Sequence, residues 1–188
     1  NPTQPHIVFC DEFSNSPPAV RAALLTIVQS REVAGRELPE GTVFVAAANE
    51  LDSAADGWEL DPATENRWTH LEFEPNPEAV ISDRRHGYRQ IPLARVPGKR
   101  IREKYLETQP VVTEFLAAQP DMSHKMPAEA TRRGVGHAWP SPRTWDRVAR
   151  LHATALAEGH SEPTIRKLII GTVGPDAGTR YLAYYGEH

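Results

Sequence analysis

Two adjacent carboxylates, Asp11 and Glu12, directly follow the apolar run Ile7–Cys10. Such a run is typical of a buried strand, and open α/β sheets bind ligands at the carboxyl ends of their strands. Phosphoryl transfer needs one acid that holds hydrated Mg²⁺ and a second carboxylate that orients or deprotonates the attacking water. Asp11 and Glu12 suit these two roles, although four apolar residues before two acids also describe an ordinary strand that runs into a loop.

Three further polar side chains lie where phosphate chemistry could use them. Asn49 ends a second apolar run, residues 42–48, and its amide could reach the same water or the γ-phosphate. Arg67 lies just before a third expected strand, and a guanidinium neutralises the charge of a transferring phosphoryl group well. Arg143 lies among two prolines and two tryptophans that indicate a helix start. Taken singly, these residues are explained equally well as turn or surface residues.

The elements that must position these side chains alternate between strands and helices. Strands are expected at residues 7–10, 42–48 and 68–74, and helices at about 20–28 and 60–67, which predicts a parallel α/β sheet. The segment Pro75-Asn76-Pro77 indicates a boundary. Helices are expected beyond it at about 78–85, 100–108, 110–118, 142–158, 162–171 and 175–185, with a long loop at 120–140. We therefore expect an α/β domain at residues 1–77 and an all-α domain at residues 78–188.

The formal net charge of −4 conceals two halves of opposite sign. Residues 1–77 contain 13 acidic and 4 basic residues, a net charge of −9, whereas residues 78–188 contain 12 acidic and 17 basic residues, a net charge of +5. This asymmetry favours two units with different functions. The basic half could contact nucleic acid, but scattered positive charge on helices is usually a solvated face, so a nucleic-acid partner is not expected.

The composition, with 39% hydrophobic and 24% charged residues, is that of a globular protein rather than a fibrous or disordered one. The sequence contains no apolar run of about 18 residues, so no membrane span is predicted. The single cysteine excludes a disulfide framework within the chain, and the eight histidines form no zinc-binding motif. These features predict a protein of the reducing cytoplasm.

The order and separation of the polar elements resemble those of bacterial AAA+ ATPases of the MoxR type, from Ile7 to the C-terminus. The apolar strand that ends in Asp11-Glu12 resembles the Walker B motif of that family, and Asn49 resembles its sensor 1 residue. The segment 60–68, with Arg67, is similar to the arginine-finger motif, and the segment 141–145, with Arg143, is similar to sensor 2. Asn49-Glu50 and Arg67-Trp68 are mild departures from the commoner Asn-Pro and Arg-Phe.

The resemblance implies a P-loop NTPase sheet, incomplete at its N-terminal side, followed by an all-α lid. It also implies a role for each site residue. Asp11 would bind Mg²⁺ through water, Glu12 would activate the hydrolytic water, and Asn49 would position that water. Arg143 would contact ATP bound by its own subunit, and Arg67 would act on the neighbouring subunit.

The same resemblance implies partners. The subunits would form a homo-oligomeric ring, most often a hexamer, with two subunits sharing each site. ATP hydrolysis would remodel a protein client, often together with a protein that carries a von Willebrand A domain. Two alternatives remain open: a catalytically inactive structural AAA+ subunit, and a DNA-handling AAA+ relative whose basic half contacts DNA.

One motif of the family, the phosphate loop G-x-x-x-x-G-K-[ST], does not occur in the 188 residues. The dipeptide Gly98-Lys99 is followed by Arg100 and lacks the earlier glycine. Without the amide cradle and lysine of that loop, the β- and γ-phosphates would lose most of their protein partners. We expect about a hundred further residues upstream, with the loop among them, and an inactive protein without them.

Overall fold

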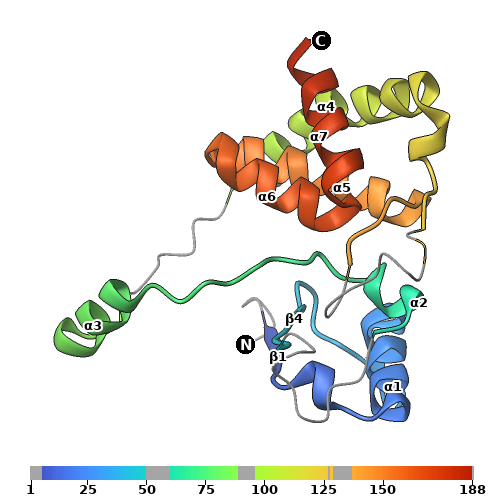
Figure 1. Ribbon diagram of the computed structural model, residues 1–188. Helices are drawn as coiled ribbons and strands as arrows, with labels where there is room; N and C mark the ends of the chain where they lie inside the picture. The colour runs from blue at the N-terminus through green and yellow to red at the C-terminus, as the bar shows by residue number, and fades with distance from the viewer. Residues whose placement is uncertain (1–5, 50–59, 89–95, 127, 129–136, 188) are drawn as a thin grey trace. The chain divides into compact units, whose positions relative to one another are not determined.

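A computed structural model describes residues 6–49, 60–88, 96–126, 128 and 137–187. These residues form a mixed α/β structure that is mostly helical, as Figure 1 shows. The chain divides into two compact units. The first contains the described residues of Asn1–Arg67 and Pro127–His137, and the second contains those of Trp68–Met126 and Ala138–His188. We refer to them as the α/β unit and the helical unit.

The α/β unit is built on two parallel strands, β1 (Ile7–Cys10) and β4 (Val43–Ala46). Their register pairs Ile7 with Val43 and Cys10 with Ala46, so both strands end at the same edge. The described residues of this unit also form the short helix η1 (Phe13–Asn15), helix α1 (Pro18–Ser30), the hairpin strands β2 (Glu32–Val33) and β3 (Arg36–Glu37), and helix α2 (Pro62–Glu65). The expected strands at 7–10 and 42–48 are confirmed, although the second is shorter than expected.

Helix α1 lies on one face of the two-stranded sheet, whose residues are half-buried, and the other face is exposed. Helix α1 and the β1 residue Cys10 line an apolar cavity of about 360 Å³, which places α1 on the Cys10 side of the sheet. On the opposite face Ile7 and Phe9 are 67% and 60% exposed, and their β4 partners Val43 and Val45 are also exposed. Two strands and one helix cannot bury apolar residues on both faces of a sheet, so this face lacks a partner among the described residues.

The helical unit has its core among four helices, α4 (Gly98–Ala118), α5 (Pro142–Glu158), α6 (Glu162–Val173) and α7 (Pro175–Glu187). The rings of Phe115, Trp145 and Tyr181 pack against one another with centroids 5.4 to 5.7 Å apart. Helix α3 (Pro77–His86) has no buried residue, and η3 (Pro120–Met122) is a single turn after α4. This unit confirms the helices expected at about 78–85, 142–158, 162–171 and 175–185.

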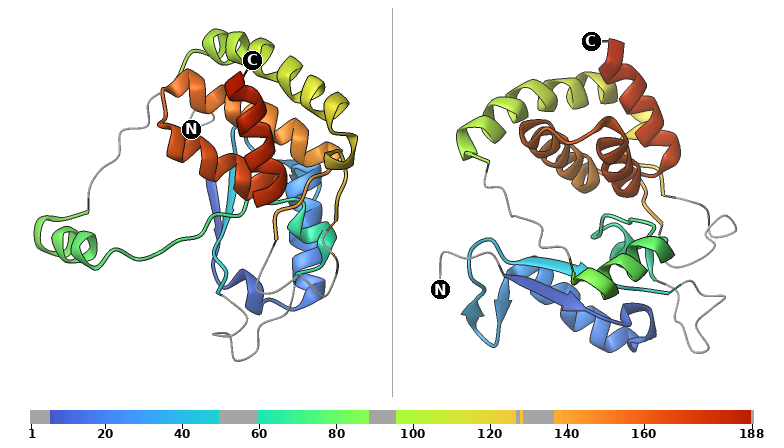
Figure 2. Two further views of the ribbon diagram at one scale, coloured as in Figure 1. Left: turned by 45° about the horizontal axis from the view of Figure 1, so that its top comes forward. Right: turned by 90° about the vertical axis from the view of Figure 1, so that its left-hand side faces the viewer.

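Two sequence predictions need correction. The helices expected at 100–108 and 110–118 are one helix, α4, which contains Pro110 and curves in both views of Figure 2. The segment 68–74 is not a strand. Its first residues instead hydrogen-bond to α5 and α6, and for this reason the units divide after Arg67, earlier than the boundary expected at residues 77 and 78.

Candidate functional site

Asp11 and Glu12 form a two-residue turn at the carboxyl end of β1. The backbone of Ala47 donates to the carbonyl oxygen of Cys10 at 2.9 Å, and its own carbonyl oxygen accepts from the N–H of Phe13 at 2.8 Å. Because Ala47 bonds to both Cys10 and Phe13, the two acids between these residues lie outside the ladder of backbone hydrogen bonds between β1 and β4. Both side chains are exposed, so a ligand at this edge of the sheet can reach them.

The backbone of Glu12 is left-handed, with φ of 52° and ψ of 38°. A residue with a Cβ adopts this conformation at a cost of about 1–2 kcal/mol. One hydrogen bond offsets part of this cost, because the Glu12 N–H donates to Oδ1 of Asp11 at 3.0 Å. The turn therefore places both acids at the strand end, with the Asp11 carboxylate against the N–H of Glu12.

The structure brings Glu12 and Asn49 together. The side-chain amide of Asn49 donates to Oε2 of Glu12 at 3.4 Å, across 37 positions of sequence. The backbone N–H of Asn49 also donates to the hydroxyl of Ser14, a fully buried side chain, at 3.3 Å. Parallel pairing of β1 and β4 explains the meeting, because equivalent ends of parallel strands lie at one edge.

A second amide, that of Asn15, also reaches this carboxylate, and the sequence interpretation did not include it. Its Nδ2 donates to Oε2 of Glu12 at 2.5 Å, so Glu12 accepts from two asparagines. The position of Asn15 three residues after Glu12, in the helical turn η1, explains the contact. This spacing was the signal available in the sequence, but it also describes an ordinary turn.

The donor set at this edge fits a magnesium ion. Mg²⁺ prefers oxygen ligands and usually keeps several waters, with one or two carboxylates and the phosphates of a substrate. Asp11 has one oxygen on the Glu12 amide and a second oxygen available to a hydrated ion. No group of three or more His, Cys, Asp or Glu side chains among the described residues could hold a metal by itself.

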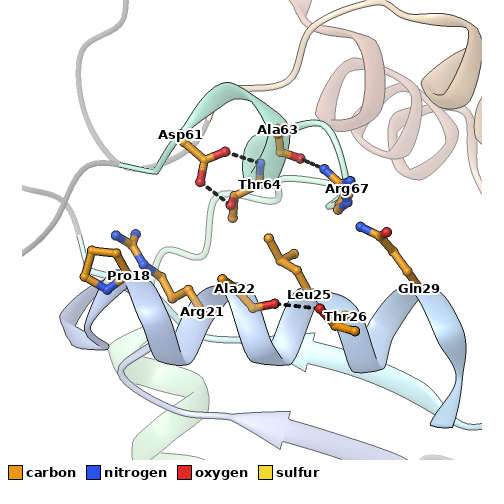
Figure 3. Close-up of a pocket in the computed structure, with 10 residues that line it drawn as sticks. All are labelled: Pro18, Arg21, Ala22, Leu25, Thr26, Gln29, Asp61, Ala63, Thr64 and Arg67. Carbon is orange, nitrogen blue, oxygen red and sulfur yellow. Dashed lines mark hydrogen bonds between the residues drawn. The ribbon is translucent and has the colours of Figure 1, made fainter.

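Arg67 lies in a different part of the α/β unit, at a cavity of about 310 Å³ between α1 and α2 (Figure 3). Its Nη1 donates to the carbonyl oxygen of Ala63 at 2.5 Å. Its Nε and Nη2 face the side-chain amide of Gln29. The amide oxygen accepts from both nitrogens when the amide is turned so that this oxygen faces the guanidinium. The guanidinium is therefore held at one end of the cavity by α1 and α2.

The same cavity contains a second arginine. Arg21 of α1 is only 5% exposed and lines the cavity with the side chains of Thr26 and Thr64. Asp61 also lies on its wall, and hydrogen bonds from Thr64 outweigh partial burial and lower the pKa of its carboxyl group. Two guanidiniums against one carboxylate give this cavity a positive character, which suits a phosphate or carboxylate group.

Arg143 lies in the first turn of α5 in the helical unit, and its side chain is exposed. The turn is well defined, because Ser141 and Thr144 form a reciprocal capping box. Arg147 follows one turn later and is half-buried. Burial, with a contribution from the charge of Arg143, lowers the pKa of its guanidinium. The predicted contact of Arg143 with ATP stays a prediction.

Comparisons of this chain with protein-family models, with curated proteins and with solved structures found no match. None of the helices in the described ranges is long and apolar enough to cross a membrane.

Proposed function

We propose that this chain is part of an ATP-hydrolysing subunit of the MoxR type of AAA+ ATPase, which remodels a protein client. The observation that carries the proposal is the meeting of Glu12 and Asn49 at the carboxyl ends of two adjacent parallel strands. Open α/β sheets bind ligands at this edge. A carboxylate and an amide at neighbouring strand ends are suited to bind the same water molecule and to hold it against a phosphate.

The proposed chemistry assigns a separate task to each residue at this edge. Asp11 would hold a hydrated Mg²⁺ through its second carboxylate oxygen, and the ion would neutralise charge on the phosphate oxygens. Glu12 accepts a hydrogen bond from the attacking water and takes its proton. Asn49 fixes the Glu12 carboxylate and the water relative to each other. Asn15 holds the carboxylate when no water is in place.

Arg67 would act through assembly of the ring, and Arg143 would act through movement of the helical unit. In the proposed ring, which we expect to be a hexamer in the cytoplasm, Arg67 reaches the phosphates of the neighbouring subunit. Its position on a positive cavity rather than beside Glu12 agrees with action on another subunit. Arg143, at the start of α5, contacts ATP in its own subunit and couples binding to a movement of the helical unit. A protein with a von Willebrand A domain is a candidate partner.

The exposed face of the sheet supports a larger α/β domain. Ile7 and Phe9 of β1 and Val43 and Val45 of β4 are exposed although all four are strongly apolar. Additional strands and helices would bury them. We propose that these elements include the phosphate loop, which the 188 residues lack, and that the 188 residues alone do not hydrolyse ATP.

The test is the substitution Glu12→Gln in the intact protein, with ATP binding and ATP turnover measured separately. Binding should be retained, and turnover should fall by about 100-fold or more, because the amide cannot accept the proton. Glu40→Gln, an exposed acid of the same unit, is the matched control and should leave turnover unchanged. Unchanged hydrolysis with Glu12→Gln would refute the proposal.

One alternative is favoured by a specific observation, the absence of the phosphate loop from the sequence. A structural AAA+ subunit without catalysis would bind its neighbours in a ring and would show no turnover in the unsubstituted protein. The same measurements therefore separate the two functions. Binding to DNA that weakens steeply with salt would instead indicate a DNA-handling relative.

A mixing experiment tests the role of Arg67 on the neighbouring subunit. Subunits with Arg67→Ala keep Glu12, and subunits with Glu12→Gln keep Arg67. Rings that contain both kinds should recover part of the activity, because some interfaces then combine an intact Glu12 with an intact Arg67. Absence of recovery in confirmed mixed rings would contradict action between subunits.

A further inference from the structure

The guanidinium of Arg67 binds a glutamine side chain that comes from another helix of the α/β unit. Its Nε and Nη2 both donate to the side-chain oxygen of Gln29, in the amide orientation that satisfies both partners. Gln29 lies in the last turn of α1, and Arg67 lies shortly after α2. Both residues belong to the α/β unit, so the contact joins two elements of one compact unit.

The backbone is fixed on both sides of this contact. The end of α1 that carries Gln29 is closed by the N–H of Arg31, which donates to the carbonyl oxygen of Ile27 at 2.9 Å. On the side of α2, the N–H of Arg67 donates to the carbonyl oxygen of Thr64 at 3.0 Å. The freedom that remains at the contact is therefore that of the two side chains.

The guanidinium lies beside an open space. Gln29 and Arg67 both line the cavity of about 310 Å³ between α1 and α2, at the same end of it (Figure 3). The Arg67 side chain is half-buried, and that of Gln29 is exposed. A close-packed side chain is confined by its neighbours, whereas a long side chain beside a cavity has several rotamers available. Hydrogen bonds, more than steric contact, therefore select the orientation of this guanidinium.

Two acceptors together engage all three nitrogens of the planar guanidinium. The Gln29 oxygen accepts from Nε and Nη2, and the carbonyl oxygen of Ala63 accepts from Nη1. A planar group that is bound at three nitrogens cannot tilt or rotate without breaking one of these bonds. Ala63 belongs to the same turn of chain as Arg67, so of these two acceptors it is Gln29 that fixes the guanidinium to a second helix.

We propose that Gln29 is the positioning residue of Arg67, which it holds in one orientation for reaction with the phosphate of the neighbouring subunit. The physical reason is preorganisation. A free arginine side chain loses rotamer entropy when it binds a phosphate, whereas a side chain that is already ordered loses less of it. Gln29 itself touches no substrate in this scheme and acts only through the guanidinium of Arg67.

This inference rests on the proposed function, in which Arg67 acts on the neighbouring subunit. A merely structural bond between Gln29 and Arg67 would only fasten α1 to the chain after α2, and its loss would lower the free energy of unfolding without a specific effect on the reaction. A positioning residue makes a different prediction. Its loss lowers kcat and leaves the KM for ATP unchanged, because Arg67 does not bind the ATP of its own subunit.

The experiment compares Gln29→Met with Gln29→Glu in the intact protein. The three side chains are similar in length, but glutamate keeps an oxygen that accepts from Nε and Nη2, whereas methionine has only a weakly accepting sulfur. The first measurement is the NMR signal of the Arg67 Nε–H. With Gln29→Met it should shift and exchange with water at least about tenfold faster, and with Gln29→Glu it should stay protected. The Nε–H of Arg36, an exposed arginine of the same unit, is the internal control and should not change.

The second measurement is steady-state ATP turnover of the same variants. Gln29→Met should lower kcat about tenfold with the KM for ATP unchanged, because a guanidinium that is no longer fixed is misplaced for most of the time. Gln29→Glu should keep kcat within about threefold of the unsubstituted protein, because it restores the acceptor. An equal loss of kcat in the two variants would overturn the inference, since only one of them lacks the acceptor.

The two measurements separate the inference from the proposed function. Absence of turnover in the unsubstituted protein would refute the proposed function, and the Arg67 Nε–H would then decide alone whether Gln29 fixes the guanidinium. An unchanged Nε–H signal in Gln29→Met would overturn the inference whatever the turnover. A changed signal with unchanged kcat, in a protein that hydrolyses ATP, would also overturn it, because the bond would then have a structural role only.

Discussion

Acidification should destabilise the helical unit through one buried imidazole, that of His152. Its side chain is 2% exposed, its Nδ1 lies 3.0 Å from the Tyr181 hydroxyl, and its ring packs 4.4 Å from that of Tyr185. Burial lowers the pKa of His152 from 6.5 to about 4, and it raises the pKa of the Tyr181 hydroxyl above its usual value. The folded protein therefore holds a neutral imidazole against a neutral phenol at physiological pH.

The size of the effect follows from the difference between the folded and unfolded states. Unfolded chains protonate His152 near pH 6.5, whereas the folded chain resists protonation until about pH 4. Between these values the unfolded state binds more protons, so the free energy of unfolding falls as the pH falls. The neutral His152 therefore contributes fully to the free energy of unfolding above pH 6.5, and this contribution is lost as the pH falls toward 4. At about 1.4 kcal/mol for each pKa unit, the loss amounts to about 3 kcal/mol.

The assay is urea unfolding of the protein at several pH values from 7.5 to 4.5, followed by tryptophan fluorescence. His152→Gln removes the titrating group. Over this pH range the free energy of unfolding of the variant should therefore fall by about 2 to 3 kcal/mol less than that of the unsubstituted protein. His160→Gln removes an exposed histidine of the same unit and should keep the original pH dependence. Equal pH dependence for the protein and its His152→Gln variant would refute the reasoning, as would an NMR titration of His152 near pH 6.5.

Three further substitutions test the packing and the site. Ile169→Ala, at a fully buried position of α6, should lower the free energy of unfolding by about 2–5 kcal/mol in the same urea assay. Ser141→Ala should cost about 1 kcal/mol, because it removes the side-chain acceptor for the Thr144 N–H at the start of α5; an unchanged midpoint would contradict this role of the cap. Asn15→Ala should raise ATP turnover of the intact protein about threefold, because Glu12 loses a hydrogen bond that stabilises its carboxylate and competes with the water; lower turnover would show that Asn15 assists Glu12 instead.

Local patterns were sufficient for most of the elements. The continuous apolar runs predicted β1 and β4, and the apolar spacing of 3 and 4 residues predicted α1. The meeting of Glu12 with Asn49 could also be expected, because it depends only on two parallel strands that end at one edge. These predictions succeeded because each depends on a short segment or on a simple rule of strand pairing.

The segment after Arg67 shows where local patterns fail. Residues 68–74 have the β-forming composition of a strand, but their backbone bonds go to α5 and α6, about 80 to 100 positions later in the chain. No pattern near Trp68 shows that Gly171 leaves room for the carbonyl of His70. The contact of Gln29 with Arg67 escaped prediction for the same reason, since neither residue has a neighbour in sequence that indicates the other.

The sequence by itself therefore determined the two strands, the helices, and the acidic edge with Asp11, Glu12 and Asn49, because these depend on periodicity and on strand polarity. The tertiary structure alone decided which side chains hold the arginines and where the segment after Arg67 binds. Those contacts join residues far apart in the chain, and close packing selects them: a glycine at 171 admits a backbone carbonyl, and a half-buried Arg147 binds the acceptor within its reach.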